Sequence, residues 1–592
     1  MFQIRWLWKN IDHKYRWLYF LGLFISFSTT IAGLINPFLS GQLVQTLFVD
    51  HNTEPMIRLL LTMLGITLVQ QGARYGMVMC FESTAQNVKS NIQLRLYENL
   101  QHQEMAFFDR IRTGDLMTRM SGDVDWCRHF TGYLFYALLE CVVRFSSTLI
   151  FFFFINVKMT LALLAVAPLL LAITFIYSRK IRPMFVELRN RMSDLNTAAQ
   201  ENISGNKVVK AFAREEYEKD KFRKNNEAFR DIDRSITKRW LHFYPGIDLL
   251  ANAMTVITIF FGAFLIMKGE MTLGQMTMFT SLSWALSSPM STLGGQLNDL
   301  QRFASSANKV IEIYYAKPTI VDRPDATDHP EVRGKVEFRN VDFEFRGKGN
   351  VLSDVSFTVE PGKTLAIMGP TGCGKTTVIN LLARLYDVKN GEVLIDDCNV
   401  HMWKLDQLRR SVAYATQDVF LFSDTVKANI AFGNPSLTDE QIADFAARAG
   451  AAEFIEKMPD GYDTVIGERG MGLSGGQRQR VALARALAMQ AAVVVLDDTT
   501  SALDSETEQY IREQLQCLPY GCTKIIVAQR ISSAKDADQI IVLDHGRITE
   551  RGTHEELLAN HGYYYETYCL QNDLPFEPQQ PDEAADGVKG GE

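Results

Sequence analysis

Six long apolar stretches occupy the first half of the chain, and they constrain its fold more than any other feature. They lie roughly at 19–48, 55–81, 131–155, 159–177, 243–267 and 273–296. A hydrocarbon core about 30 Å thick needs about 20 mainly apolar residues in helical form. Backbone polar groups that cross lipid must bond within the helix itself. The pattern therefore predicts six transmembrane helices.

The connections between these stretches differ in length and in charge. Three are short, whereas those at about 82–130 and 178–242 are long, rich in Lys and Arg, and helical in pattern. Positively charged connections stay on the cytoplasmic side of a membrane. We therefore expect a multi-pass protein of the cell (plasma or inner) membrane, with both long connections and both termini in the cytoplasm. The aromatic and basic N-terminus lacks the apolar core of a cleavable signal peptide, so it is expected to form an interfacial helix.

Charge and cysteine usage exclude two other classes of function. The 61 basic and 68 acidic residues give a net charge of −7, and no basic stripe predicts nucleic-acid binding. The eight Cys have neither CxxC pairs nor metal-ligand spacing, so they are expected to be reduced thiols.

Some ionisable and Met residues fall inside the predicted spans. Charged side chains are costly in lipid, so they face a bundle interior or a water-filled cavity. Two interpretations stay open for them, structural pairing or substrate contact. Glu140 and Arg144 are four residues apart and could pair on one helix face. The Met residues suit either ordinary packing or an adaptable cavity. The ionisable residues inside the spans are Arg74, Glu82, Glu140, Arg144 and Asp248. The Met residues are Met254, Met267, Met276, Met278 and Met290.

From about residue 324 the pattern changes to short apolar strands, Gly turns and amphipathic helices, which is typical of an α/β domain. The strand TLAIM leads into a GxxxxGK[ST] loop and then a helix. This is the phosphate-binding P-loop in its proper context, in which Gly residues let consecutive N–H groups face the phosphates. The predicted nucleotide-binding residues are Gly369, Pro370, Thr371, Gly372, Cys373, Gly374, Lys375, Thr376 and Thr377.

A second apolar strand, AVVVL, ends in Asp497 and Asp498. Acidic residues at the carboxyl end of a parallel strand lie where nucleotide chemistry occurs in such sheets. Asp497 is expected to orient Mg²⁺ together with Thr376. Asp498 occupies the place of the residue that positions or deprotonates the attacking water.

Between these motifs the segment Leu473-Ser474-Gly475-Gly476-Gln477 opens a helix. Ser at a helix start can be only an N-cap, but LSGGQ is the signature of ABC ATPases. From about residue 15 to 570 the chain resembles an ABC exporter half with fused membrane and ATPase domains, the class that includes bacterial multidrug and lipid exporters. The resemblance implies a membrane domain at 1–320 and a nucleotide-binding domain at 321–574, followed by a disordered tail at 575–592.

The resemblance also assigns roles to residues outside the three motifs. The stretches 107–125 and 198–216 are similar to the two coupling loops of such exporters, which implies that 121–125 and about 208–215 contact the ATPase domains. Phe345 matches the aromatic residue that stacks on adenine. Gln417 matches the Q-loop residue that reaches Mg²⁺, so the implied metal set is Thr376, Gln417 and Asp497. Residues 466–470 resemble the loop beside the coupling helices, and Asp504 closes a D-loop at 501–504.

Two positions depart from the pattern of an efficient ATPase. Asp498 stands where the family usually has Glu, and Gln529 stands where it usually has the switch His. The shorter carboxylate retracts by more than an ångström, and a misplacement of about 1 Å can cost roughly 10²-fold in rate. Gln cannot become cationic beside the γ-phosphate. We therefore expect a site that binds ATP and Mg²⁺ but hydrolyses ATP poorly.

This mixture of intact and altered motifs predicts a heterodimer of non-identical halves. In the family, each P-loop faces the partner's LSGGQ, so Ser474–Gln477 would complete a competent site on the partner. A homodimer with slow turnover and an ATP-gated channel-like protein remain as alternatives. Substrates are expected to be amphipathic drugs, lipids or peptides moved by alternating access. Cys373, near Lys375 and a helix N-terminus, is expected to favour the thiolate.

Overall fold

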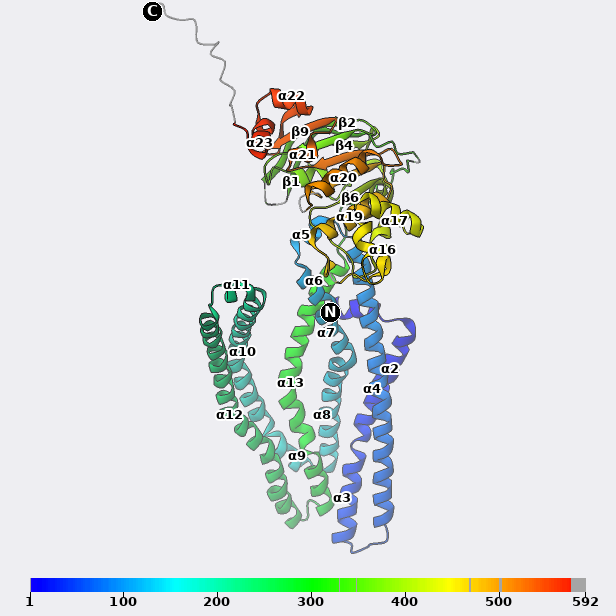
Figure 1. Cartoon of the computed structure of the whole chain (residues 1–592). Helices are drawn as coiled ribbons and strands as arrows, with labels where there is room; N and C mark the ends of the chain where they lie inside the picture. Colours follow the sequence, from blue (N-terminus) through cyan, green and yellow to red (C-terminus); the bar gives the residue numbers. More distant parts are fainter. Residues whose placement is uncertain are drawn as a thin grey trace, which may run out of the picture. The chain divides into compact units, whose positions relative to one another are not determined.

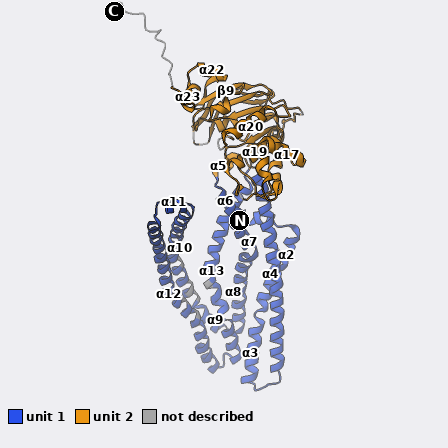
Figure 2. Ribbon diagram, viewed as in Figure 1, with its two compact units in different colours: residues 1–102, 111–316 blue, residues 103–110, 317–592 orange. Residues whose placement is uncertain are grey.

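The computed structural model describes residues 2–329, 331–345, 347, 349–467, 470–499 and 503–575. It divides into two compact units, Met1–His102 with Ile111–Ala316, and Gln103–Arg110 with Lys317–Glu592 (Figure 2). The boundary predicted at 320 lies close to this division. The assignment of Gln103–Arg110 to the second unit, by contrast, was not expected from the sequence. The predicted disordered tail lies outside the described residues apart from Pro575.

The first unit is entirely helical (Figure 1). Its longest helices, α4, α10, α12 and α13, run through both the apolar stretches and the charged connections. The helices are α1 (Phe2–Lys9), α2 (His13–Ala32), α3 (Ile35–Phe48), α4 (Met56–Gln101), α6 (Thr113–Thr118), α7 (Val124–His129), α8 (Phe135–Ile155), α9 (Val157–Leu164), α10 (Ala167–Ser204), α11 (Asn206–Ala211), α12 (Glu215–Met267) and α13 (Leu273–Tyr314), with π-helical turns η1 (Arg119–Asp123) and η2 (Phe130–Leu134) on either side of α7.

Four helical segments within the described residues are long and apolar enough to cross a membrane: His13–Phe48, Met56–Gln101, Thr113–Ile155 and Glu215–Met267. The predicted window at 159–177 is helical but is divided between α9 and α10, and Pro168 lies in the first turn of α10. Pro lacks the N–H that would bond to the carbonyl four residues earlier, and its ring clashes with that carbonyl, so it favours a break or kink at this point. The window at 273–296 lies on α13, where Ser, Thr and Gly dilute the apolar character. Crossing of the membrane by these two windows stays a prediction.

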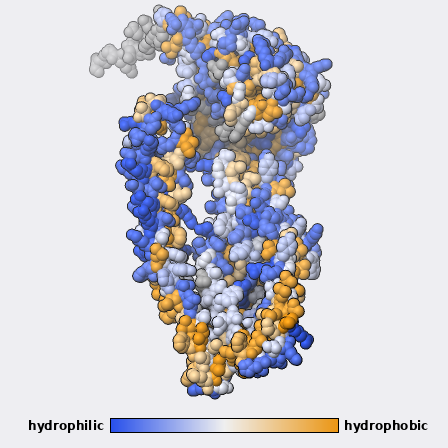
Figure 3. Space-filling view, turned by 60° about the horizontal axis from the view of Figure 1, so that its bottom comes forward, coloured by the Kyte–Doolittle hydropathy of each residue, from blue (hydrophilic) through white to orange (hydrophobic). Residues whose placement is uncertain are grey.

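Apolar surface gathers toward one end of the helices in Figure 3, and hydrophilic surface predominates on the parts of α10 and α12 near α11. Helices α3 and α13 approach most closely at two glycines. A Cβ on Gly41 would lie 2.6 Å from the backbone oxygen of Gly274, and one on Gly274 would lie 2.4 Å from the oxygen of Gly41. Small residues of this kind allow close backbone packing of membrane helices.

The second unit is built on two β-sheets, and both faces of the larger one are covered. Val493 and Val495 belong to one buried apolar cluster, and Val494 and Leu496 to another. Such strands read as continuous apolar runs in the sequence. The six-stranded sheet has the order β10-β9-β3-β8-β7-β6, with β3 (Thr364–Met368), β6 (Val412–Ala415), β7 (Val493–Asp497), β8 (Thr523–Val527) and β9 (Gln539–Asp544) parallel and β10 (Arg547–Gly552) antiparallel.

The smaller sheet is antiparallel, with the order β2-β1-β4-β5. Its strands are β1 (Val336–Phe345), β2 (Gly349–Val359), β4 (Asn390–Ile395) and β5 (Cys398–Asn399). The helices of the unit are α5 (Met105–Arg110), α14 (Lys375–Leu382), α15 (Leu405–Arg410), α16 (Val426–Ile430), α17 (Asp439–Arg448), α18 (Ala452–Glu456), α19 (Gly475–Ala488), α20 (Ser505–Gln516), α21 (Ile531–Ala534), α22 (His554–Ala559) and α23 (Tyr563–Gln571), with 3₁₀ turns at Val400–Met402, Ala431–Gly433 and Gly461–Asp463.

Candidate functional site

The P-loop joins β3 to α14, and its glycines are required by the backbone itself. Gly369 has φ +138°, and a Cβ there would lie 2.0 Å from the backbone oxygen of Leu543. Gly374 has φ +109° and forms the N-cap of α14. Only Gly adopts such angles without strain. The loop therefore leaves the strand in a fixed path that opens the helix N-terminus, where anions are favoured.

Lys375 lies across this loop. Its Nζ donates to the carbonyl oxygens of Gly369 and Pro370 at 2.7 and 2.9 Å. The side chain is buried, so these two carbonyls satisfy an ammonium group that would otherwise be costly in the interior. A nucleotide phosphate at the loop would compete with them for the ammonium.

The structure contradicts the expectation that Cys373 favours the thiolate. Its side chain is 4% exposed, and burial raises the pKa of the thiol. The nearby Lys375 acts in the opposite direction but is the smaller influence. Loss of solvation disfavours the charged thiolate more than the neighbouring cation favours it.

Asp497 and Thr376 come together at the end of β7. Thr376 Oγ1 donates to Asp497 Oδ2 at 3.3 Å. Asp497 is 4% exposed, and burial raises the pKa of its carboxyl group. A hydroxyl and a buried carboxylate are hard oxygen ligands of the type that Mg²⁺ prefers, so this donor set fits the ion.

Asp498 stands at the centre of a small cluster with the two other residues singled out from the sequence. Its Oδ2 accepts from Gln529 Nε2 at 3.1 Å and from Gln417 Nε2 at 3.4 Å. The residue has a positive φ of +48°, and its N–H donates to the Val527 oxygen at 3.1 Å. The structure thus brings together the Q-loop residue, the residue after β7 and the switch residue after β8.

The signature residues lie at the surface, and their side-chain hydrogen bonds are made with one another. Ser474 is the N-cap of α19, its Oγ accepting from the N–H of Gln477, whose side chain in turn accepts from the N–H of Ser474. Ser474 and Gly475 are exposed, and Gly476 and Gln477 are half-buried. Within the described part of the chain, no hydrogen bond joins these four residues to the P-loop. The turn is a preformed helix start at the surface, closed by a capping box.

Asp504 caps a second helix. It accepts from the N–H and the hydroxyl of Thr507 at 3.3 and 2.8 Å, and these bonds lower the pKa of its carboxyl group. Thr500, Ser501 and Ala502 beside it lie outside the described residues, as do Glu468 and Arg469 of the predicted loop at 466–470.

Phe345, at the end of β1, lies in an aromatic group. Its ring meets those of Phe343 and Tyr386 edge-on, at centroid distances of 4.9 and 5.3 Å. The ring is half-buried and so leaves part of its surface accessible for stacking. No ring contact or hydrogen bond among the described residues joins it to the P-loop.

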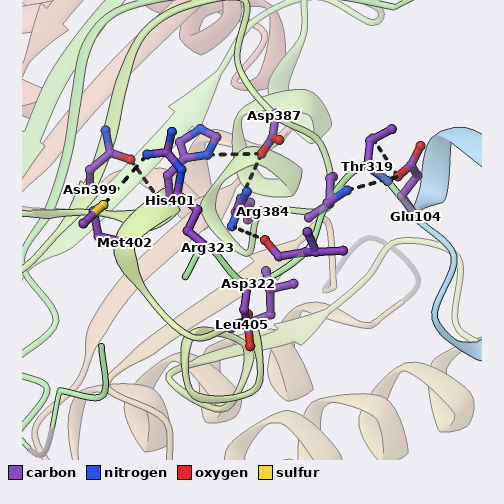
Figure 4. A network of polar contacts seen from close by, with 12 residues as sticks. Glu104, Thr319, Asp322, Arg323, Arg384, Asp387, Asn399, His401, Met402 and Leu405 are labelled. Carbon is purple, nitrogen blue, oxygen red and sulfur yellow. Dashed lines mark hydrogen bonds and ion pairs between the residues drawn. The ribbon is translucent and has the colours of Figure 1, made fainter. Parts of the chain in front are cut away.

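The segment Gln103–Arg110, whose last four residues open the stretch 107–125 that resembles the first coupling loop, is bonded to the rest of the ATPase unit at two points. Glu104 Oε2 accepts from the Thr319 hydroxyl at 2.7 Å and from the Ile320 N–H at 3.2 Å (Figure 4). Asp109 Oδ2 accepts from the Tyr386 hydroxyl at 2.7 Å. The contacts of residues 121–125, predicted to bind the ATPase domains, lie within the first unit, where Asp123 accepts from Ser306 Oγ at 2.6 Å. The resemblance already covered residues 107–110, but it did not show which residues of the stretch bond to the ATPase unit.

Beyond Glu104, the chain that enters the ATPase domain is held by further polar contacts (Figure 4). Arg384, 4% exposed, donates to the Val321 oxygen at 3.4 Å and to Asp387 at 2.9 Å. Asp322 accepts from the N–H of Leu405 at 2.8 Å. The stretch from Thr319 to Asp322 is therefore part of the second unit's fold and not a free linker.

The first unit contains a polar cavity of about 160 Å³. Glu140 and Arg144 form an ion pair within α8, as their spacing predicted, and the Arg144 guanidinium lies 5.4 Å from the ring centroid of Trp284. Arg74 also lines the cavity. The remaining lining residues are Thr29, Thr30, Gly33, Leu34, Gln70, Gln71, Met77, Thr148, Leu282 and Ala285.

The other candidates inside the spans have different environments. Glu82 pairs with Arg128 at 2.9 Å. Met254 and Met278 are buried, consistent with packing, whereas Met267 is exposed. The side chain of Met290 lies outside the described set.

Comparison with known proteins finds a family match in each of the two units. Residues 19–290 match the ABC transporter transmembrane region, and residues 352–501 match the ABC transporter ATPase family. The chain is 34% identical over 550 residues to an "ATP-dependent lipid A-core flippase" of Syntrophus aciditrophicus (strain SB), covering 92% of this chain and 90% of that protein. It is 37% identical over 487 residues to the "Uncharacterized ABC transporter ATP-binding protein YknU" of Bacillus subtilis (strain 168), covering 82% and 83%.

A solved structure agrees with these matches. The chain aligns with the "Structure of a bacterial Atm1-family ABC exporter with ATP bound" at a TM-score of 0.78 and 25% identity, covering 98% of this chain and all of that one. The predicted fold class, the membrane location and the ATP-hydrolysing translocase activity are confirmed. The chain belongs to the ABC transporter family, as an exporter half in which a helical membrane part and an ATPase part are fused.

Proposed function

We propose that this chain binds MgATP at its own P-loop and hydrolyses it slowly. The phosphates would lie on the loop N–H groups with Lys375, and Phe345 would stack on the adenine. Thr376, Asp497 and Gln417 would hold Mg²⁺, which when bound screens the phosphate charge. Because Asp497 is buried with a raised pKa, the cation would also stabilise its ionised form.

The observation that carries the slow hydrolysis is the state of Asp498. A general base must aim a free lone pair at the attacking water, and hydrogen bonds to one oxygen of a short carboxylate restrict how its other oxygen can be aimed. Here the shorter side chain has its Oδ2 engaged by the amides of both Gln417 and Gln529. Gln529 keeps no cationic form with which to stabilise the developing charge. A site with Asp498 and Gln529 would therefore bind ATP but promote the attack of water on the γ-phosphate poorly.

The exposed signature supports assembly with a second, non-identical half. Ser474 and Gly475 present a preformed helix start to solvent, and a helix N-terminus favours a phosphate group. We infer that Ser474, Gly475, Gly476, Gln477 and Asp504 complete the partner's nucleotide site. ATP binding would close the two ATPase parts, and hydrolysis mainly at the partner's P-loop would reset the membrane parts.

We infer an amphipathic substrate, whose polar head would lie in the cavity of about 160 Å³ in the membrane unit and whose apolar body would lie outside it. The cavity combines the cations of Arg74 and Arg144, the Glu140 carboxylate and several amide and hydroxyl groups with the apolar rings and chains around them. A molecule with a charged or strongly polar head and an apolar body is complementary to such a lining. The relatives named as lipid A-core flippases support an amphipathic, lipid-like substrate moved outward by alternating access.

The test measures ATPase activity in nanodiscs, with the chain alone and with a non-identical exporter half that copurifies with it. Asp498→Asn is made in this chain, and the Glu after the corresponding Asp is changed to Gln in the partner. We expect activity to require the partner and to vanish with the partner's substitution only. Brisk turnover by this chain alone, abolished by Asp498→Asn, would overturn the proposal in favour of a homodimer.

The substrate is tested separately in vesicles containing the assembled transporter. ATP-driven outward movement of a fluorescent phospholipid is expected, and Arg144→Gln is expected to reduce it while ATP binding is retained. ATP-gated ion flux without lipid movement would identify a channel-like protein instead.

A further inference from the structure

The C-terminal helix α23 ends beside the switch residue of the ATPase site. Gln571, its last residue, uses both polar atoms of its side chain on the main chain around Gln529. Its Nε2 donates to the Gln529 oxygen at 2.9 Å, and its Oε1 accepts from the Ile531 N–H at 2.8 Å. One carboxamide therefore satisfies the two backbone groups that flank Arg530.

These two groups are the pair that a neighbouring strand would engage. In a parallel sheet, one residue bonds to the carbonyl of residue i−1 and to the N–H of residue i+1 on the adjacent strand. Strand β8 ends at Val527, and α21 begins at Ile531, so the backbone between them lies outside both elements. The side chain of Gln571 replaces a strand residue there and fixes the path of the chain.

The same segment is also held by a buried carboxylate. Glu508, on α20, accepts from the hydroxyls of Ser532 and Ser533 at 2.9 and 2.7 Å and pairs with Arg530 at 3.4 Å. Its side chain is only 6% exposed. The segment 529–533 is thus held between α20 and α23, and the side chain of Gln529 projects from it to Asp498.

Docking of α23 does not depend on Gln571. Tyr564 and Cys569 anchor the helix with 0% and 1% exposure, and Ile531 belongs to the same apolar cluster as Tyr564. Gln571 itself is exposed. Removal of its carboxamide would leave the helix in place while freeing the backbone at Gln529.

We propose that Gln571 is a positioning residue, through which the C-terminal helix sets the placement of Gln529 against Asp498. It acts on the main chain of the switch residue and does not contact ATP. The lifetime of ATP bound at this chain's P-loop depends on it.

The test compares Gln571→Met, which keeps the length and removes both hydrogen bonds, with Asn572→Ala as the matched control. Asn572 is the next residue, and its carboxamide donates to Tyr568 of its own helix. The full chain is studied in nanodiscs, assembled as it purifies. Hydrogen exchange of the 529–533 segment is followed by mass spectrometry, and decay of labelled ATP bound to this chain is followed with Lys375→Ala as the blank.

In Gln571→Met we expect exchange in this segment to rise about fivefold or more, with the thermal midpoint unchanged. Decay of bound ATP should change about threefold or more, in the same direction as in Gln529→Ala. Because the residue acts through Gln529, the double variant should decay no differently from Gln529→Ala alone. Asn572→Ala should match the wild type.

Three outcomes would overturn the proposal. Exchange at 529–533 equal to that of the wild type would show that Gln571 does not hold the segment. An ATP lifetime unaffected by Gln571→Met would remove the functional role. An additive effect in the double variant would mean that Gln571 acts by another route.

Discussion

Asp498 receives hydrogen bonds from two carboxamides whose parent residues come from different strand ends. A single methylene separates it from the Glu that the family usually has at this place. Since each 1.36 kcal/mol of barrier is a factor of ten in rate, a small displacement of one carboxylate is enough to separate a binding site from a catalytic one.

Restoring both residues should restore turnover. The double substitution Asp498→Glu with Gln529→His is expected to raise phosphate release at this chain's site by about tenfold or more, because the carboxylate extends toward the attacking water and an imidazole can carry positive charge. Release is measured under saturating MgATP, with Asp498→Asn as the inactive reference. An unchanged rate would mean that the slow step lies outside these two side chains.

Asp497 predicts a pH dependence of stability in the nucleotide-free chain. Its raised folded-state pKa means that the folded protein binds the proton more tightly than the unfolded chain does. The resulting stability is present at low pH and is lost as pH rises above the ordinary Asp value of about 3.9 and through the raised value. Because Asn does not ionise, the Asp497→Asn variant does not lose this stability as the pH rises.

The thermal midpoint of Asp497→Asn is therefore expected to exceed that of the wild type at neutral pH, and the difference should shrink as the pH is lowered toward 4. Saturating Mg²⁺ and ATP should reverse the order, since the cation favours the ionised carboxylate. A difference that is constant across this pH range would contradict the assignment of burial as the cause.

The sequence alone predicted the P-loop residues and the acids Asp497 and Asp498, because the motif spacing and the apolar strands before them are visible in it. It could not foresee the direction of the Cys373 pKa, because the sequence shows the adjacent cation but not the burial. The clamp of Gln571 on residue 529 was equally out of reach, since the two positions are 42 residues apart and share no motif.

Among the elements, α3 and α13 are a pair whose contact depends on residue size. Each glycine at the crossing meets the backbone of the other helix, and a backbone atom cannot move aside as a flexible side chain can. The crossing is therefore set by two residues and not by the larger apolar faces around them.

Gly274→Ile is expected to destabilise the membrane unit by about 1–3 kcal/mol, because its side chain would overlap the Gly41 backbone. The thermal midpoint in detergent checks this. Gly76→Ala is the control, as nothing lies within 4 Å of a Cβ at that site. Equal midpoints for both variants would mean that the helices separate without cost.

Helix existence was predictable from the apolar windows, but the helix boundaries were not. The division at Ala165–Val166 between α9 and α10 falls inside a window that looks continuous in composition. The coupling segments show the same limit. The stretch 107–125 resembles a coupling loop as a whole, but the resemblance did not indicate that Glu104 and Asp109 bond to Thr319, Ile320 and Tyr386. Contact of 121–125 with an ATPase domain stays a prediction.

For the whole molecule, the ATPase unit is discontinuous in the sequence. Its fold takes in Gln103–Arg110, which is separated from Lys317 by the greater part of the membrane unit. Exchange of residues 317–575 for those of a relative is therefore expected to give a poorly active hybrid. Exchange of 103–110 together with them should recover activity, measured as substrate-stimulated ATPase. Full activity of the first hybrid would show that the eight residues are interchangeable.

The same arrangement bears on how such genes can be recombined. A single crossover at the start of the ATPase region would pair Glu104 and Asp109 of one parent with the Thr319 and Tyr386 positions of another. Shuffling between transporters then preserves the contacts only if both parents carry compatible residues at these places, or if two segments are inherited together. A domain boundary drawn on the linear sequence would not show that 103–110 and the ATPase region need to be inherited together.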